Sequence, residues 1–304
     1  MVKNQMKTNN KVKDSLGDRI FGIGNILILT VAALLVIYPL YFVVIASFSD
    51  PVAVQSGEVL FTPKGFTLDG YIAILHNKAI ISGYANSLFC VVFGTGINLF
   101  FTITCAYGLS KKTLPFRNGI MFFLMFTMFF GGGMIPTYLL VKNLGLLNSL
   151  WSLILTDALS IMNVIIVRTY FQTSIPNELY EAALIDGCSD IKAFIKIALP
   201  LAKPIIAIMA LFYGVGQWNQ LFKGIIYIQN QEVYPLQLVL RNILIQNSSS
   251  GGSVGDSASF LAQQRMAELI KYGAIIVGSL PPLLVYPLVQ KHFKKGVMVG
   301  SVKG

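Results

Sequence analysis

The chain has 304 residues, of which 55% are hydrophobic and only 12% are charged, and its mean hydropathy is +0.68. Soluble domains carry about 25% charged residues, so this chain has too few charges to cover a water-facing surface of its size. The net charge of +10 is not accompanied by a basic helix, an aromatic-interleaved motif or a zinc pattern, which argues against nucleic-acid binding. The composition indicates a membrane protein.

Six apolar segments, each long enough to cross about 30 Å of hydrocarbon, follow one another along the chain. Only helices and closed barrels satisfy the backbone in lipid, and the alternating stretches of about ten residues that mark a barrel do not dominate here. We therefore predict an all-α fold, a six-helix transmembrane bundle. The predicted spans are Ile20–Phe48, Ala85–Leu109, Gly119–Val141, Leu150–Phe171, Pro204–Phe222 and Leu269–Val289.

The basic residues predict the orientation of the chain. Sixteen of the 23 Lys and Arg fall on one side if both termini are cytoplasmic, as the positive-inside rule expects. The first span is too long for the apolar region of a signal peptide, about 7–15 residues, so we expect it to be retained. The predicted parts are a cytoplasmic tail 1–19, a six-span transmembrane domain 20–290 and a cytoplasmic tail 291–304.

The connecting loops are unequal in length. Loops 49–84 and 223–268 are predicted to face outside, and loop 172–203 to face the cytoplasm. Within the second outer loop, Gln246–Ser259 is rich in Ser, Gly and Asn. This composition predicts a flexible segment that does not pack. It is either a surface linker or an arm that meets an external partner such as a binding protein.

Polar side chains within the predicted spans are candidates for a solute path, because such groups are costly in lipid and often face a cavity. Aromatic faces and amides suit a solute with C–H surfaces and hydroxyl groups, and interhelical hydrogen bonding is the alternative role. Asp157 is the one clear acid in a span, and Arg168 lies about 16 Å along the same helix, too far to pair with it. The candidates are Asn98, Thr102, Asp157, Asn163, Tyr213, Gln217, Trp218 and Asn219.

Three glycines in the third span, Gly131 to Gly133, precede Pro136. They predict either a broken helix beside the pore or close helix packing through small residues.

The cytoplasmic loop predicts a short helix–turn–helix. Pro176 suits the first helical position, and Glu178 and Glu181 favour the positive end of a helix. Gly187 suits the left-handed residue after a helix, and Ser189 suits the N-cap of a second helix. On spacing alone the loop is either a connector or a docking element.

The same loop resembles a known pattern. Importers of the ATP-binding-cassette type carry the EAA motif, E-A-A-x3-G-x9-I-x-L-P, in their permease subunits, and every defined position matches Glu181–Ala183, Gly187 and Ile197–Pro200. The whole chain is similar to the small permease subunit of maltose-type carbohydrate importers. Softer likenesses at Gly132–Tyr138, Gly214–Asn219 and Tyr234–Gln237 resemble the LplC/YtcP-like branch of that family.

The resemblance implies a multi-subunit importer in a bacterial cell membrane. A second permease subunit would complete a heterodimer, and two ATPase subunits would carry ATP and Mg²⁺. An external binding protein would deliver an oligosaccharide such as a complex or acidic glycan fragment. This chain would bind no cofactor, metal or nucleic acid and have no catalytic residue, and it has no GxxxxGK(S/T) motif. The implied coupling residues are Glu178, Glu181, Ala182, Ala183, Asp186, Gly187, Ile197, Leu199 and Pro200.

Two other functions fit the sequence less well. A stand-alone secondary transporter predicts paired ionisable residues at the membrane midplane and internal repeats, whereas the spans hold one isolated acid and no convincing repeat. A membrane-embedded enzyme predicts clustered His, Asp or Ser, whereas His76 and His292 lie outside the spans.

Overall fold

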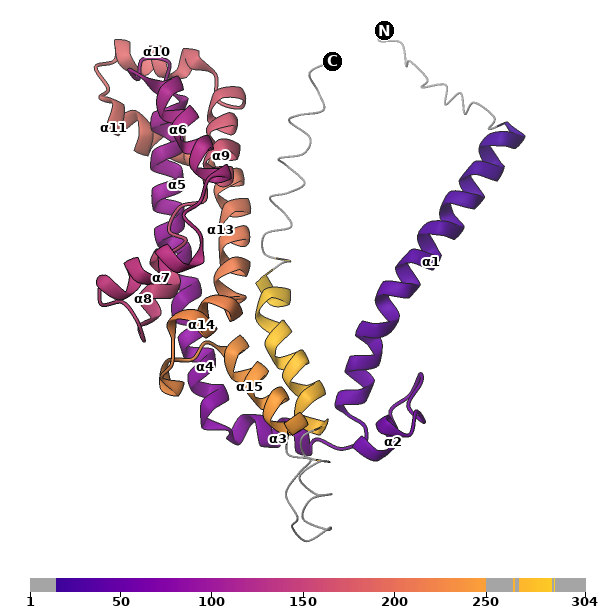
Figure 1. Cartoon of the computed structure of the whole chain (residues 1–304). Coiled ribbons are helices and arrows are strands. Elements are labelled where there is room, and N and C mark those ends of the chain that lie inside the picture. Colours follow the sequence, from indigo (N-terminus) through magenta and orange to yellow (C-terminus); the bar gives the residue numbers. More distant parts are fainter. Residues whose placement is uncertain (1–14, 250–264, 266–267, 286, 288–304) are drawn as a thin grey trace. The chain divides into compact units, whose positions relative to one another are not determined.

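The described residues of the computed structural model form helices joined by turns, with no strand among them (Figure 1). This confirms the predicted all-α class. The chain divides into two compact units, Met1–Thr67 and Leu68–Gly304. The structure describes residues 15–249, 265, 268–285 and 287, so most of the two predicted tails lies outside it.

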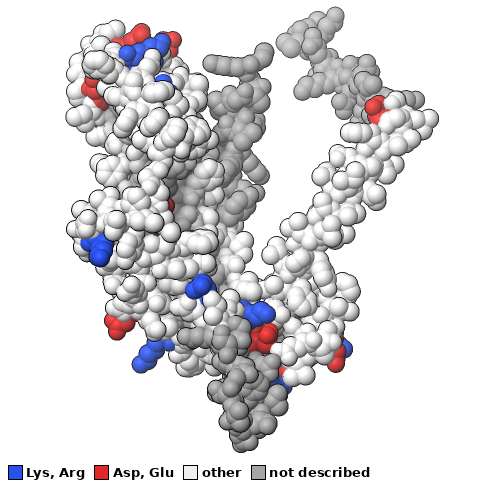
Figure 2. Space-filling model, in the orientation of Figure 1, with Lys and Arg blue, Asp and Glu red and all other residues white. Residues whose placement is uncertain are grey.

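Three of the described helices are long and apolar enough to cross a membrane: Leu16–Ser47, Lys78–Ser110 and Glu268–Val285. Two pairs of helices, each bent at a short break, would raise the number of candidate spans to five. On the face of the second unit shown in Figure 2, charged side chains gather toward the two ends and leave a broad band with few charges between them. Such a band suits the hydrocarbon layer of a membrane.

The first unit is built on α1 (Leu16–Ser47), which agrees with the predicted first span. Ser15 caps this helix, and its hydroxyl accepts the amide hydrogen of Asp18 at 3.2 Å. The 32 residues extend about 48 Å, enough to cross a bilayer with tilt. After α1 the chain turns through α2 (Pro51–Gln55) and folds back, so that the Tyr41 hydroxyl donates to the carbonyl of Phe61 at 2.5 Å.

The second predicted span is one continuous helix of 33 residues that begins at Lys78, before the predicted Ala85. Asn77 accounts for the earlier start, because its side chain accepts the amide of Ala79 at 3.0 Å and so caps the first turn. A π-helical turn interrupts the α-helical pattern midway. The parts are α4 (Lys78–Phe89), η1 (Cys90–Gly94) and α5 (Thr95–Ser110).

The third predicted span is a broken helix. α6 (Arg117–Phe129) and α7 (Met134–Asn143) meet at an angle of 107°. Gly133 stands at the break with φ +84°, a conformation that favours glycine. A Cβ at Gly131 or Gly133 would meet no described atom within 4 Å, so tight packing within the described chain does not explain these two glycines. Of the two roles expected for them, the broken helix is confirmed.

The fourth predicted span, Leu150–Phe171, is not one continuous helix, and that prediction was wrong. α8 (Leu150–Leu155) ends early and α9 (Ile161–Thr173) starts after a break at 156–160. Ser160 caps α9, as serine often does at a helix start. The 13 residues of α9 extend only about 20 Å.

A bend of 78° separates the segment Asp190–Leu201 from the helix that begins at Lys203, just before the predicted start of the fifth span at Pro204. α13 ends at Trp218, four residues short of the predicted Phe222, and Asn219 follows as a non-helical cap. The helices of this region are α11 (Asp190–Ala193), η2 (Phe194–Ala198), α12 (Leu199–Leu201) and α13 (Lys203–Trp218).

Both predicted outer loops contain helices, and those of the second loop bury apolar side chains. Leu236, Val239 and Leu240 are buried against Trp218. The Ser- and Gly-rich stretch Gln246–Ser259 was predicted to be flexible throughout, yet its first four residues end a helix, and 250–259 lies outside the described residues. The outer helices are α3 (Asp69–His76), α14 (Leu221–Tyr227), η3 (Gln231–Val233) and α15 (Leu236–Ser249).

The main core lies where α5, α9 and α13 pack side by side (Figure 1). Small and branched side chains allow this close packing, and Ala106, Val164, Val167 and Met209 are almost completely buried. One end of this core supports the loop between α9 and α13, and polar groups lie farther along the same three helices.

Candidate functional site

The α10–α11 loop has the helix–turn–helix form that the sequence predicted. α10 (Asn177–Ile185) starts one residue after Pro176, which takes the extended N-cap conformation rather than the first helical one. Gly187 adopts φ +70°, and its amide donates to the carbonyl of Leu184 at 3.0 Å, which closes the helix end. Ser189 caps α11 by accepting the amide of Lys192 at 3.4 Å.

An aromatic cluster, made of Tyr107, Phe171, Tyr180 and Phe194, attaches this loop to the core. The ring centroid of Tyr107, on α5, lies 4.6 Å from that of Phe194 and 6.3 Å from that of Tyr180, on α10. Lys111 places its Nζ 3.2 Å from the centroid of the Tyr180 ring, in a cation–π contact. Burial lowers the pKa of Lys111 and raises that of Tyr180.

The outward face of the loop combines acids with apolar side chains. Glu178 and Glu181 are exposed, and Leu184 and Ile185 are 73% and 87% exposed. Exposed leucine and isoleucine beside carboxylates are typical of a surface that a protein partner covers.

The remaining motif residues divide into exposed and packed groups. Ala182 and Asp186 are exposed, whereas Ala183, also an implied coupling residue, turns inward and is buried. Leu199 packs against the main core, Ile197 is half-buried and Pro200 is exposed. The second half of the motif therefore also holds the loop on the bundle.

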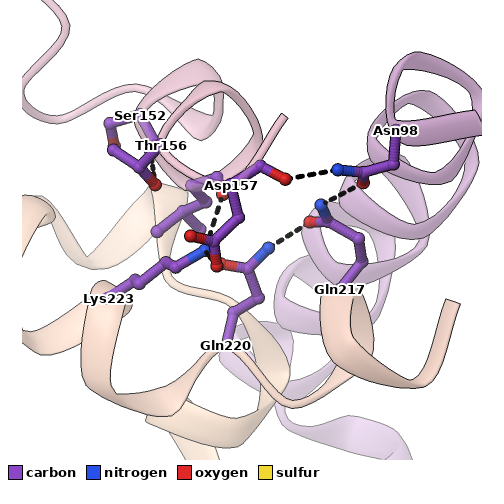
Figure 3. A network of polar contacts seen from close by, with 8 residues as sticks. Asn98, Ser152, Thr156, Asp157, Gln217, Gln220 and Lys223 are labelled. Carbon is purple, nitrogen blue, oxygen red and sulfur yellow. Dashed lines mark hydrogen bonds and ion pairs between the residues drawn. The ribbon is translucent and has the colours of Figure 1, made fainter. Parts of the chain in front are cut away.

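A polar network joins three of the candidate path residues (Figure 3). Asn98, on α5, donates to the backbone carbonyl of Asp157 in the α8–α9 break. The amide of Gln217, on α13, donates to Asn98 Oδ1 at 2.8 Å. Asn98 and Gln217 are 1% and 3% exposed, so the network links three elements inside the bundle.

Two further residues, Gln220 and Lys223, extend this network, and the sequence reading missed both. Gln220 Nε2 donates to Gln217 Oε1, and Lys223 forms an ion pair with the Asp157 carboxylate (Figure 3). Lys223 also donates to the carbonyl of Leu153 at 3.4 Å. The regular three-residue spacing of positions 217, 220 and 223 was the available signal, but the predicted span boundary at Phe222 placed Lys223 in the outer loop.

Thr102 and Tyr213, two more candidates, pair with each other. Their hydroxyl oxygens lie 2.6 Å apart, and the amide of Ser160 donates to the Tyr213 hydroxyl at 3.4 Å. This contact joins α5, α13 and the start of α9, as expected of interhelical hydrogen bonds.

The other three candidates lie outside these contacts. Trp218 donates to the carbonyl of Gly278 at 2.9 Å and thereby holds the last described helix. Asn219 is exposed and donates to the carbonyl of Val215 at 3.1 Å, while Asn163 is half-buried on α9.

A cavity of about 330 Å³ lies between the second span, α13 and the last described helix. Its walls are almost wholly apolar, with Leu88, Val92, Leu211 and Pro282 among the lining residues. Because it offers sugar hydroxyls almost no partners, the polar network is the better candidate for contact with a sugar.

The long apolar helices of this chain and its helix pairs bent at short breaks are typical of a multi-pass membrane protein. The chain belongs to the family of binding-protein-dependent transport system inner membrane components, whose family model matches residues 79–299. Its members are permeases of ATP-binding-cassette importers, so a stand-alone secondary transporter is excluded. The resemblance stated from the EAA motif is confirmed.

Two curated relatives and one solved structure match nearly the whole chain. The polygalacturonan/rhamnogalacturonan transport system permease protein YtcP of Bacillus subtilis (strain 168) is 43% identical over 90% of this chain and 94% of its own length. Protein LplC of the same organism is 42% identical over 94% and 96%. A crystal structure of a bacterial ABC transporter involved in the import of the acidic polysaccharide alginate is similar, with TM-score 0.84, 34% identity and coverage of 92% and 99%.

Proposed function

We propose that this chain is one of two different permease subunits in an ATP-driven importer of acidic oligosaccharides. The second permease subunit completes the pore, and an external binding protein delivers the sugar. Two separate ATPase subunits bind ATP and Mg²⁺, and this chain performs no chemistry itself. Both termini and the α10–α11 loop face the cytoplasm, in line with the distribution of basic residues.

The observation that carries the coupling role is the form of the α10–α11 loop. It presents Leu184 and Ile185 to a partner while Gly187 fixes the turn and the aromatic cluster fixes the base. A loop held in this way moves as a rigid unit when a partner that is bound to it moves. An ATPase pair that opens and closes would then favour different states of the bundle, because its contacts differ between the two states.

Acidic oligosaccharides are the substrate class that the relatives favour. Polygalacturonan is a polymer of a sugar acid, and the alginate transporter is described as importing an acidic polysaccharide. In the network of Asn98, Gln217 and Gln220, the acceptor left for a sugar hydroxyl is Gln220 Oε1, which has no hydrogen-bond partner among the described residues. We assign the solute path to the side of α5 and α13 on which the polar network lies.

Site-directed cross-linking tests the coupling role. In a Cys188→Ser background, which removes the natural thiol of the loop, Ile185→Cys is treated with a short thiol-to-amine reagent in the complete importer. We expect a covalent product with an ATPase subunit, and a yield that changes when ATP is added. Gln231→Cys, which is also exposed but lies in η3, is the control and should give no such product. Absence of an ATPase product from Ile185→Cys would contradict the docking role.

A further inference from the structure

Lys223 and Asp157 form an ion pair at the edge of the polar network, and the two partners differ in exposure. The side chain of Asp157 is 68% exposed, whereas that of Lys223 is 24% exposed. Lys223 is also held by the carbonyl of Leu153. Two contacts therefore hold the ammonium group, whereas its carboxylate partner is largely exposed.

This difference makes the carboxylate exchangeable. An ion pair with an exposed partner contributes little net stability, since the exposed group keeps most of its interaction with water. If another carboxylate took the place of Asp157, the released Asp157 would remain hydrated and Lys223 would remain paired. An ammonium group suits such an exchange, because it acts as a point charge and accepts many carboxylate geometries.

A free hydrogen-bond acceptor lies beside this pair. Gln220 is 4% exposed, and its Oε1 has no hydrogen-bond partner among the described residues. Its Nε2 is occupied by Gln217, which leaves the oxygen end of the amide facing Asp157 and Lys223 (Figure 3). A buried acceptor without a partner is costly, and a ligand hydroxyl would satisfy it.

We propose that Lys223, Asp157 and Gln220 form a subsite for one sugar-acid ring. The ring carboxylate replaces Asp157 on Lys223, and a ring hydroxyl donates to Gln220 Oε1. Asp157 holds Lys223 in position when no ligand is present and competes with the ligand carboxylate. This inference rests on the proposed importer function and adds the residues that select for a negative charge.

The test measures uptake by the complete importer in proteoliposomes, with one binding-protein preparation used throughout. The substrates are trigalacturonate and its methyl ester, which keeps the rings but loses the charges. We expect Lys223→Gln to lower trigalacturonate uptake about tenfold, which corresponds to the loss of one charge-assisted hydrogen bond. Uptake of the methyl ester should not change. Lys223→Arg should retain most uptake.

Asp157→Asn separates this role from that of a purely structural ion pair. If Asp157 competes with the ligand, this variant keeps or increases trigalacturonate uptake, opposite to Lys223→Gln. If the pair only holds helices together, both variants lower uptake of both substrates and lower the thermal stability of the complex, and the subsite is overturned. Wild-type importer that takes up no trigalacturonate would overturn the proposed substrate class and this subsite together.

Discussion

Gly94 allows Gln217 to reach Asn98. It stands on the second span where α13 passes closely, and a Cβ there would lie 2.5 Å from Cδ of Gln217 and 2.8 Å from both of its amide heteroatoms. No atom could remain at those distances, so Gln217 would have to move. The hydrogen bond from Gln217 to Asn98 therefore requires a residue without a Cβ at position 94.

We therefore expect Gly94→Ala to break the network and leave buried amides unpaired, at a cost of about 1–3 kcal/mol. Thermal unfolding of the purified protein in detergent measures the loss of stability, and uptake by the complete importer measures the loss of function. Gly96→Ala is the matched control, because it lies two residues away and its Cβ would meet no described atom within 4 Å. Equal behaviour of the two variants would contradict the role of Gly94.

At the scale of elements, α5 connects the α10–α11 loop to the polar network. Its C-terminal end carries Tyr107 of the aromatic cluster, and its N-terminal half carries Asn98 and Thr102. Since a packed helix transmits displacement along its axis, movement of the α10–α11 loop reaches the network through a single element. We expect Tyr107 to be a positioning residue for coupling.

Tyr107→Ala tests this link. Removing the ring leaves Phe194 and Tyr180 without their shared neighbour and loosens the loop from α5. Uptake should then fall at least about tenfold, while ATP hydrolysis by the assembled importer falls much less, because the ATPase subunits themselves are intact. Tyr107→Phe keeps the ring, loses only a 3.5 Å contact to the carbonyl of Asp190, and should behave like the wild type. Parallel loss of hydrolysis and uptake in Tyr107→Ala would indicate failed assembly instead of lost coupling.

At the scale of the whole molecule, the long apolar segments made the helical membrane class predictable. The length of such a segment and the spacing of its apolar residues can be read from a short stretch of sequence. The turn at Gly187 was predictable for the same reason, because a positive φ after a helix favours glycine over other residues. The break at 156–160 was missed because its flanks are as apolar as a continuous span, and only the distant partners Asn98 and Lys223 show what Asp157 does. Pairings across the bundle follow from tertiary packing and cannot be read from one segment.

The central claim is that a separate ATPase drives solute through this chain by way of the α10–α11 loop. Its most direct test is trigalacturonate uptake into proteoliposomes containing the complete importer, with wild type compared with Gly187→Pro, a substitution that forces φ to about −65° where the turn needs +70°. We predict ATP-dependent uptake by the wild type, and none by the variant although it inserts and assembles normally. Normal uptake by Gly187→Pro, or uptake by this chain alone without nucleotide, would contradict the account.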